Sequence, residues 1–232
     1  MHTSPSLQSQ HRFSDFELLI FDLDGTLLDT SIDLAHAVNY ALQALNKTPL
    51  ALVDVLKMVG DGARTLLTRA LGQQSPEEEL QLAVLKFREH YATHLADHSR
   101  PYNGMTEVLA HFHDHKKAVL TNKPHDLTLT LLERLRLMQE FVLVQGAQAS
   151  LPLKPDPTGL QDMLRKLQIS ATRALMIGDS ENDILVGKAA GVRTCAATYG
   201  FRPQENLLAL APDYVIHTPR DLIALALANK ND

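Results

Sequence analysis

The chain has 232 residues, a length that fits one large domain or a core domain with a smaller insert. Hydrophobic residues make up 45% of it and charged residues 21%, a composition that excludes a disordered or fibrous protein. The net charge is −5, and no run of Lys and Arg is long enough to follow a nucleic-acid backbone. We therefore do not expect nucleic acid as a partner.

The ends and the cysteine content favour a cytoplasmic protein. Residues 1–15 are polar, lack the apolar region of a secretory signal and are predicted to form a flexible tail. No apolar stretch reaches the ~18 residues of a membrane span, so no membrane is expected as a partner. The single cysteine, Cys195, excludes an intrachain disulfide, which suits a reducing compartment. It lies in an apolar segment, and we expect a buried thiol rather than a nucleophile.

The first predicted strand is the apolar run Glu17–Asp22, which leads into a loop at Gly25. A capping box at Thr30–Asp33 then predicts the start of a helix. From about residue 48 to residue 100 the pattern indicates only amphipathic helices. One of them begins at a second capping box, Ser75–Glu78.

Helices and strands alternate after residue 100. The predicted helices cover residues 106–115, 126–138, 156–167, 182–190 and a terminal stretch from 219. The predicted strands cover residues 117–121, 141–145, 173–178, 192–198 and 214–217. Such alternation predicts a parallel sheet covered on both faces. We therefore expect a Rossmann-like α/β core formed by residues 16–28 and 101–232, with residues 29–100 inserted as a small all-helical cap domain.

Polar side chains follow several of these strands at the point where each strand ends. In an open parallel sheet, ligands bind beyond the carboxyl ends of the strands, so we expect these side chains to lie together. They are Asp22, Asp24, Gly25, Thr121, Asn122, Lys123, Asp179 and Asp183, with Lys154 in a neighbouring loop.

Carboxylates gathered in this way repel each other and are costly to bury. A divalent cation resolves both problems, and a few carboxylate oxygens with waters left on the metal suit Mg²⁺. Lys154 adds a second positive charge. The sequence therefore predicts Mg²⁺ and a dianionic phosphate at this edge.

Four ordered segments carry a family resemblance: Asp22–Leu27, Thr121–Asn122, Lys154–Pro155 and Gly178–Asp183. They resemble the four motifs of the haloacid dehalogenase superfamily, and the helical insert is similar to that family's small cap. Two further stretches, Met58–Arg64 and Thr121–Pro124, resemble the bacterial phosphoglycolate phosphatases. The resemblance implies a phosphoric monoester hydrolase.

The resemblance also implies the catalytic roles. Asp22 is expected to attack phosphorus and become an aspartyl-phosphate. Asp24 is expected to protonate the leaving oxygen and later to activate water. Thr121 and Lys154 are expected to stabilise the transferred group, with Lys154 also orienting Asp22. The expected phosphate-binding residues are Gly25, Thr121, Asn122 and Lys154.

The implied Mg²⁺ ligands are Asp22, Asp179, Asp183 and the backbone carbonyl of Asp24. Asp183 has an alternative role, because Ser180–Asp183 is itself a capping box. In the cap, Arg64 is a candidate for binding a substrate carboxylate; its alternative is an exposed position on a helix.

By analogy with the family, 2-phosphoglycolate is the expected substrate, cleaved to glycolate and phosphate. The alternatives are a sugar phosphomutase and a phosphatase for another sugar or metabolite phosphate. Asp24 argues against a dehalogenase or a phosphonate hydrolase, and the complete motif set argues against a catalytically silent sensor. Both a monomer and a homodimer remain open.

Overall fold

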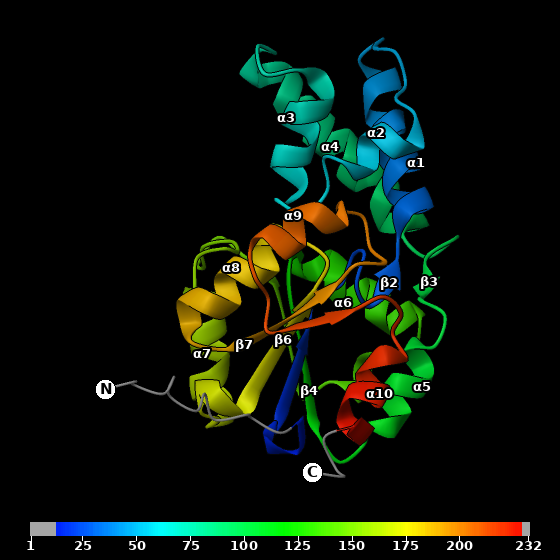
Figure 1. Cartoon of the computed structure of the whole chain (residues 1–232). Helices are drawn as coiled ribbons and strands as arrows, with labels where there is room; N and C mark the ends of the chain where they lie inside the picture. The colour runs from blue at the N-terminus through cyan, green and yellow to red at the C-terminus, as the bar shows by residue number, and fades with distance from the viewer. Residues whose placement is uncertain (1–12, 229–232) are drawn as a thin grey trace.

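The computed structural model describes residues 13–228 (Figure 1). Within this range, six parallel strands form the central sheet in the order β5-β4-β1-β6-β7-β8. Their bounds are β1 Leu18–Phe21, β4 Lys116–Pro124, β5 Leu143–Ala147, β6 Ala174–Gly178, β7 Arg193–Ala197 and β8 Tyr214–Ile216. The predicted α/β class with a parallel sheet is thus confirmed.

Strand β1 is buried on both faces, as its unbroken apolar sequence predicts. Successive side chains of a strand point to opposite faces. Leu18 and Ile20 accordingly join one hydrophobic cluster, and Leu19 and Phe21 join another. The two faces of the sheet are therefore filled by separate sets of helices.

Helices α7 Thr158–Leu167 and α8 Glu181–Ala190 cover the face that contains Leu18. Helices α5 Met105–His111, α6 His125–Arg134 and α10 Asp221–Ala228 cover the other face, and α9 Gln204–Ala209 lies near the carboxyl edge (Figure 1). Short 3₁₀ turns occur at η1 Phe13–Asp15, η2 Met138–Glu140 and η3 Ala171–Arg173. None of the described helices is long and apolar enough to cross a membrane.

The remaining helices stand above the carboxyl edge of the sheet (Figure 1). They are α1 Ser31–Ala44, α2 Leu52–Leu56, α3 Ala63–Leu71 and α4 Glu77–His94. Two short antiparallel strands, β2 Leu28–Asp29 and β3 Arg100–Pro101, pair at the base of this group. This group is the expected all-helical insert. The pairing of β2 with β3, which connect it to the core, supports the proposed cap boundaries at residues 29 and 100.

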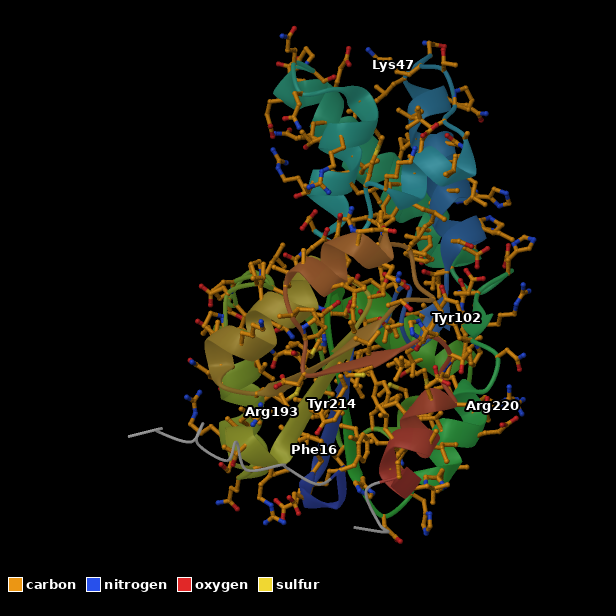
Figure 2. All side chains as sticks on the ribbon, viewed as in Figure 1. Phe16, Lys47, Tyr102, Arg193, Tyr214 and Arg220 are labelled. Atoms are coloured by element: carbon orange, nitrogen blue, oxygen red, sulfur yellow. The ribbon has the colours of Figure 1, made fainter. Side chains whose placement is uncertain are left out.

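The predicted tail, residues 1–15, lies mostly outside the described residues. Its last residues instead form η1, where Phe13 is buried and its ring packs 5.4 Å from that of Phe16. Tyr214 packs on both rings. Figure 2 shows Phe16 and Tyr214 at the end of the sheet away from the cap, whereas Lys47 lies at the far tip of the cap. Phe13 thus belongs to the core, because its apolar ring finds a buried aromatic pocket there.

Candidate active site

The carboxyl edge of the sheet brings the predicted motif residues together. Asp22 directly follows β1, and its backbone N–H donates to the carbonyl of Ile177 in β6 over 2.9 Å. Thr121 lies in β4, Asp179 directly follows β6, and Lys154 lies in the loop between β5 and α7. Because β4 and β6 flank β1, their ends converge on Asp22.

Lys154 is buried between two carboxylates. Its Nζ lies 2.9 Å from Asp22 Oδ1 and 2.6 Å from Asp183 Oδ1, and it donates to the carbonyl of Leu120 over 2.9 Å. Although burial alone would lower the pKa of Lys154, the carboxylates of Asp183 and Asp22 raise it above its ordinary value. The lysine therefore remains a cation beside Asp22.

A second feature is a group of three buried carboxylates, Asp22, Asp179 and Asp183, whose facing oxygens lie within 4.8 Å of one another. Burial raises the pKa of Asp179 to about 8, with a further increase from the neighbouring Asp22 and Asp183. Burial also raises the pKa of Asp183 to about 6, even though Lys154 opposes this shift. The group carries more negative charge than its surroundings neutralise, and its all-oxygen donor set fits a hard divalent cation.

Asp183 uses its two oxygens differently. Oδ2 accepts hydrogen bonds from the backbone N–H of Ser180 over 3.0 Å and from its hydroxyl over 2.7 Å, completing the capping box of α8. Oδ1 faces Lys154. The capping role considered from the sequence is therefore present, and it leaves one oxygen directed into the site.

Asp179 is held by residues that the sequence did not single out. Its Oδ1 accepts from the hydroxyl of Thr26 over 2.7 Å, and its Oδ2 accepts from the backbone N–H of Phe201 over 2.8 Å. Gly25 and Gly200 pack against it so closely that a Cβ on either would lie 2.3 Å from an Asp179 atom. No local sequence pattern identifies Phe201 or Gly200, because both come from a loop that only the fold brings here.

Asp24 lies apart from the three carboxylates. Its side chain accepts from the hydroxyl of Thr30 over 2.8 Å and from Nζ of Lys123 over 2.9 and 3.1 Å. Lys123 Nζ also donates to the hydroxyl of Tyr91, in the cap helix α4, over 2.7 Å. Lys123 is a further candidate site residue; the sequence placed it at a strand end and in the stretch Thr121–Pro124 but assigned it no role.

Thr121 and Asn122 are both buried beside the cavity described below. Thr121 Oγ1 accepts from the backbone N–H of Lys123 over 3.3 Å, which leaves its own hydroxyl proton to donate. The side-chain amide of Asn122 instead binds backbone groups through both its nitrogen and its oxygen. It donates to the carbonyls of Gly60 and Lys154 and accepts from the N–H of Lys154 over 2.8 Å. Its amide therefore joins a cap loop to the lysine loop.

Arg64 is not brought to this site. Its guanidinium binds both oxygens of Glu77 over 2.7 and 2.6 Å on the surface of the cap, where more than half of its side chain is exposed. Ala63 lines the cavity, but Arg64 does not. The suggestion that Arg64 binds a substrate carboxylate is therefore not supported, because helix α3 presents its neighbour inward and Glu77 already satisfies its charge.

A small cavity separates the cap from the carboxyl edge, with about 40 Å³ open to the centres of water-sized molecules. Asp22, Asp24, Thr121 and Lys123 contribute polar groups from the core. The cap and the neighbouring helices contribute an apolar lining: Leu34, Val59, Ala63, Leu66, Phe87, Pro124 and Leu127. The cavity has the size for a small ligand, with the carboxylates of Asp22 and Asp24 on its core side.

Comparison with known proteins identifies close relatives over most of the chain. Residues 19–197 match the family described as haloacid dehalogenase-like hydrolase. The chain is 38% identical over 220 residues to a phosphoglycolate phosphatase of Photobacterium profundum, covering 91% of this chain and 96% of that one. It is 36% identical over 216 residues to phosphoglycolate phosphatase 1 of Pseudomonas aeruginosa, covering 90% and 79% of the two chains.

Solved structures show the same fold. The crystal structure of a "predicted phosphoglycolate phosphatase" from Haemophilus somnus superposes with a TM-score of 0.86. The two sequences are 28% identical, and the match covers 91% of this chain and 98% of the other. The similarity therefore includes both the parallel sheet and the helical group above it.

Proposed function

Because the chain belongs to the haloacid dehalogenase-like hydrolase family, we propose that it is a Mg²⁺-dependent phosphatase that works through an aspartyl-phosphate on Asp22. The proposed substrate is a small phosphate monoester, 2-phosphoglycolate, cleaved to glycolate and phosphate. The relatives named phosphoglycolate phosphatase support both reaction and substrate. The family resemblance carried by the sequence motifs is confirmed; a cytoplasmic location and a monomeric or homodimeric state stay predictions.

One observation carries the proposal. Asp22 lines the cavity, while its Oδ1 faces the buried Nζ of Lys154 at 2.9 Å without an aligned hydrogen bond. A carboxylate that merely capped a turn would need no buried lysine behind it. A nucleophilic carboxylate does need one, because a dianionic phosphate must approach it against charge repulsion.

In the first step, an oxygen of Asp22 attacks phosphorus and forms a new P–O bond. The bond from phosphorus to the ester oxygen breaks, and Asp24 gives that oxygen its proton so that glycolate leaves with a neutral hydroxyl group rather than as an alkoxide. Lys154 holds Oδ1 of Asp22, which leaves Oδ2 free to attack. The hydroxyl of Thr121 donates to a phosphoryl oxygen, and the backbone N–H groups near Gly25 approach the same group.

In the second step, a water molecule gives a proton to Asp24 and attacks phosphorus. The bond between phosphorus and Asp22 breaks, which releases phosphate and restores the carboxylate. Asp22, Asp179, Asp183 and the backbone carbonyl of Asp24 would hold Mg²⁺, which when bound supplies positive charge to the phosphate oxygens. The apolar cap lining limits the access of bulk water during both steps.

The test measures phosphate release from a panel of small phosphate esters with Mg²⁺ and with a chelator. We expect release that requires Mg²⁺, that is fastest with 2-phosphoglycolate and that falls to background in Asp22→Asn. Asp97→Asn is the matched control, because Asp97 is a half-exposed carboxylate in the cap that does not line the cavity. Full activity of Asp22→Asn would contradict the mechanism, and a preference for another ester would contradict the substrate.

A further inference from the structure

The cavity contains a cation that the proposed mechanism does not use. Among the described residues that line it, Lys123 is the one with a positive charge; Lys154 lies behind Asp22 and does not line the cavity. Lys123 comes from β4 of the core, and its side chain is 2% exposed. Burying an ammonium group is costly, so its retention beside a reaction site calls for a partner.

The contacts of Lys123 leave it able to accept a ligand. Its Nζ lies 2.9 and 3.1 Å from the two oxygens of Asp24 and 2.7 Å from the hydroxyl of Tyr91, and 4.4 Å from the centre of the Tyr91 ring. An ammonium group has three protons to donate. When the two oxygens of Asp24 share one proton and Tyr91 takes the second, the third is available to a group bound in the cavity.

The rest of the cavity defines what that group is. Asp24 is neutralised by its ion pair with Lys123, and the cap side is lined by Phe87, Leu66 and Val59, which offer no hydrogen bonds to the hydroxyls of a sugar. A carboxylate near Lys123 would be attracted by a cation in a site of low polarity, where such an attraction is strong. A substrate whose non-phosphate end is uncharged would have no comparable attraction to Lys123.

We propose that Lys123, supported by Tyr91, binds the non-phosphate end of the substrate and makes the site selective for short phosphate monoesters with a carboxylate beside the ester carbon. This inference rests on the proposed phosphatase function. It assigns to Lys123 the part that the sequence suggested for Arg64. Tyr91 belongs to α4, so the pair also spans the boundary between cap and core.

The test compares three esters of similar length that differ at the far end: 2-phosphoglycolate, ethyl phosphate and aminoethyl phosphate. For the wild type we expect the highest kcat/KM with 2-phosphoglycolate and the lowest with aminoethyl phosphate. In Lys123→Met, the preference for 2-phosphoglycolate over ethyl phosphate should fall about 10- to 100-fold, mainly through KM, the size expected of one lost charge-assisted hydrogen bond. Aminoethyl phosphate should gain relative to ethyl phosphate, since Asp24 is then no longer paired.

Lys117→Met is the matched control. Lys117 is also a buried lysine of β4, but it donates to the carbonyls of Leu109 and Phe112 and does not line the cavity. We expect it to leave the ratio between the esters unchanged. If Lys123→Met does not fold, Tyr91→Phe decides: it should reduce the preference for 2-phosphoglycolate, and an unchanged preference would overturn the proposal.

The outcomes separate the inference from the function on which it rests. A wild type that releases no phosphate from any ester defeats the proposed function. A wild type that hydrolyses ethyl phosphate as well as 2-phosphoglycolate defeats the inference and the proposed substrate, but leaves the phosphatase mechanism standing. A wild-type preference for 2-phosphoglycolate that Lys123→Met keeps defeats the inference alone. An equal loss with all three esters in Lys123→Met also overturns the inference, because Lys123 would then act only by positioning Asp24.

Discussion

At the scale of single residues, the backbone packed against Asp179 leaves no room for a side chain at Gly25. Gly25 has a φ of +88°, a conformation that residues with a side chain rarely adopt. A Cβ at this position would also lie 2.3 Å from Asp179 Oδ2, far inside contact distance. The glycine is therefore required twice, once for its conformation and once for the close approach of the carboxylate.

Comparing Gly25→Ala with Gly72→Ala separates these two requirements. Gly72 also has a positive φ, +96°, but a Cβ there would meet nothing within 4 Å. We expect Gly72→Ala to cost about 1–3 kcal/mol of unfolding free energy through backbone strain alone. Gly25→Ala should cost clearly more and should also abolish phosphate release. Urea denaturation measures the unfolding free energy that each variant loses. Equal losses would show that the close contact with Asp179 adds nothing to the backbone strain at Gly25.

The sequence correctly placed residues whose position follows from the end of a strand. Asp22 and Asp179 stand at strand ends, so the topology alone places them together. Cys195 is a buried thiol, as its apolar neighbours predict. Lys123 was not assigned a role, because a pattern does not tell which of several adjacent polar residues faces a cavity. For Arg64 the sequence left carboxylate binding and an exposed helix position open, and the structure shows the second, because its partner Glu77 comes from another helix of the cap.

At the scale of elements, the cap is tied to its own return connection through one buried carboxylate. Asp33, in the first turn of α1, accepts from the backbone N–H groups of His98 and Ser99 and from the Ser99 hydroxyl over 2.7 Å. Burial alone would raise the pKa of Asp33, but the hydrogen bonds from Ser99 and His98 outweigh it and lower the pKa below its ordinary value. The residue therefore stabilises the fold as an anion.

We expect Asp33→Asn to lower the unfolding free energy by at least about 2 kcal/mol near neutral pH, since an amide replaces an anion that accepts several hydrogen bonds. The pKa in the folded state is the lower one, so this contribution is complete above the unfolded-state pKa of about 3.9 and is lost as pH falls through the folded value. The unfolding free energies of the wild type and of Asp33→Asn should therefore become similar at acidic pH. Asp97→Asn is the exposed control, and a difference independent of pH would contradict this account.

Element boundaries illustrate what a linear pattern leaves undetermined. The predicted helix 126–138 ends at Arg134, because Arg136 adopts a φ of +56° and the chain turns into η2. The sheet itself was predictable, since strands buried on both faces have nearly continuous apolar sequences. The pairing of β2 with β3 was not, because two residues in each strand carry no detectable period.

At the scale of the whole molecule, the cap loop of residues 57–62 is docked on the core by polar contacts. Arg202 donates to the carbonyl of Lys57 over 2.6 Å and lies 3.5 Å from Asp61. Asn182 donates to Asp61 Oδ1 over 2.6 Å, and Asn122 donates to the carbonyl of Gly60 over 3.0 Å. An insert was foreseeable from the absence of strand patterns, but these contacts join residues too distant in sequence to be read from it.

Arg202→Ala should loosen this docking without unfolding the core. We expect faster amide hydrogen exchange in residues 57–62 and a KM for 2-phosphoglycolate raised several-fold, because the closed cap is then less populated. Arg193→Ala is the control: Arg193 pairs with Asp213 in the core, and Figure 2 shows it far from the cap. Unchanged exchange in the loop of Arg202→Ala would show that Arg202 does not hold the cap.

The measurement that tests the central claim most directly is the capture of the phosphoryl group on Asp22. In Asp24→Asn, p-nitrophenyl phosphate still loses its leaving group, because nitrophenolate departs without a proton, whereas hydrolysis of the acyl phosphate lacks its base. We predict a burst of nitrophenolate equal to the enzyme present, and mass spectrometry after acid quenching should find the phosphoryl group on Asp22, removable by hydroxylamine. A phosphoryl group on any other residue, or steady release with no burst and no labelled carboxylate, would contradict the mechanism.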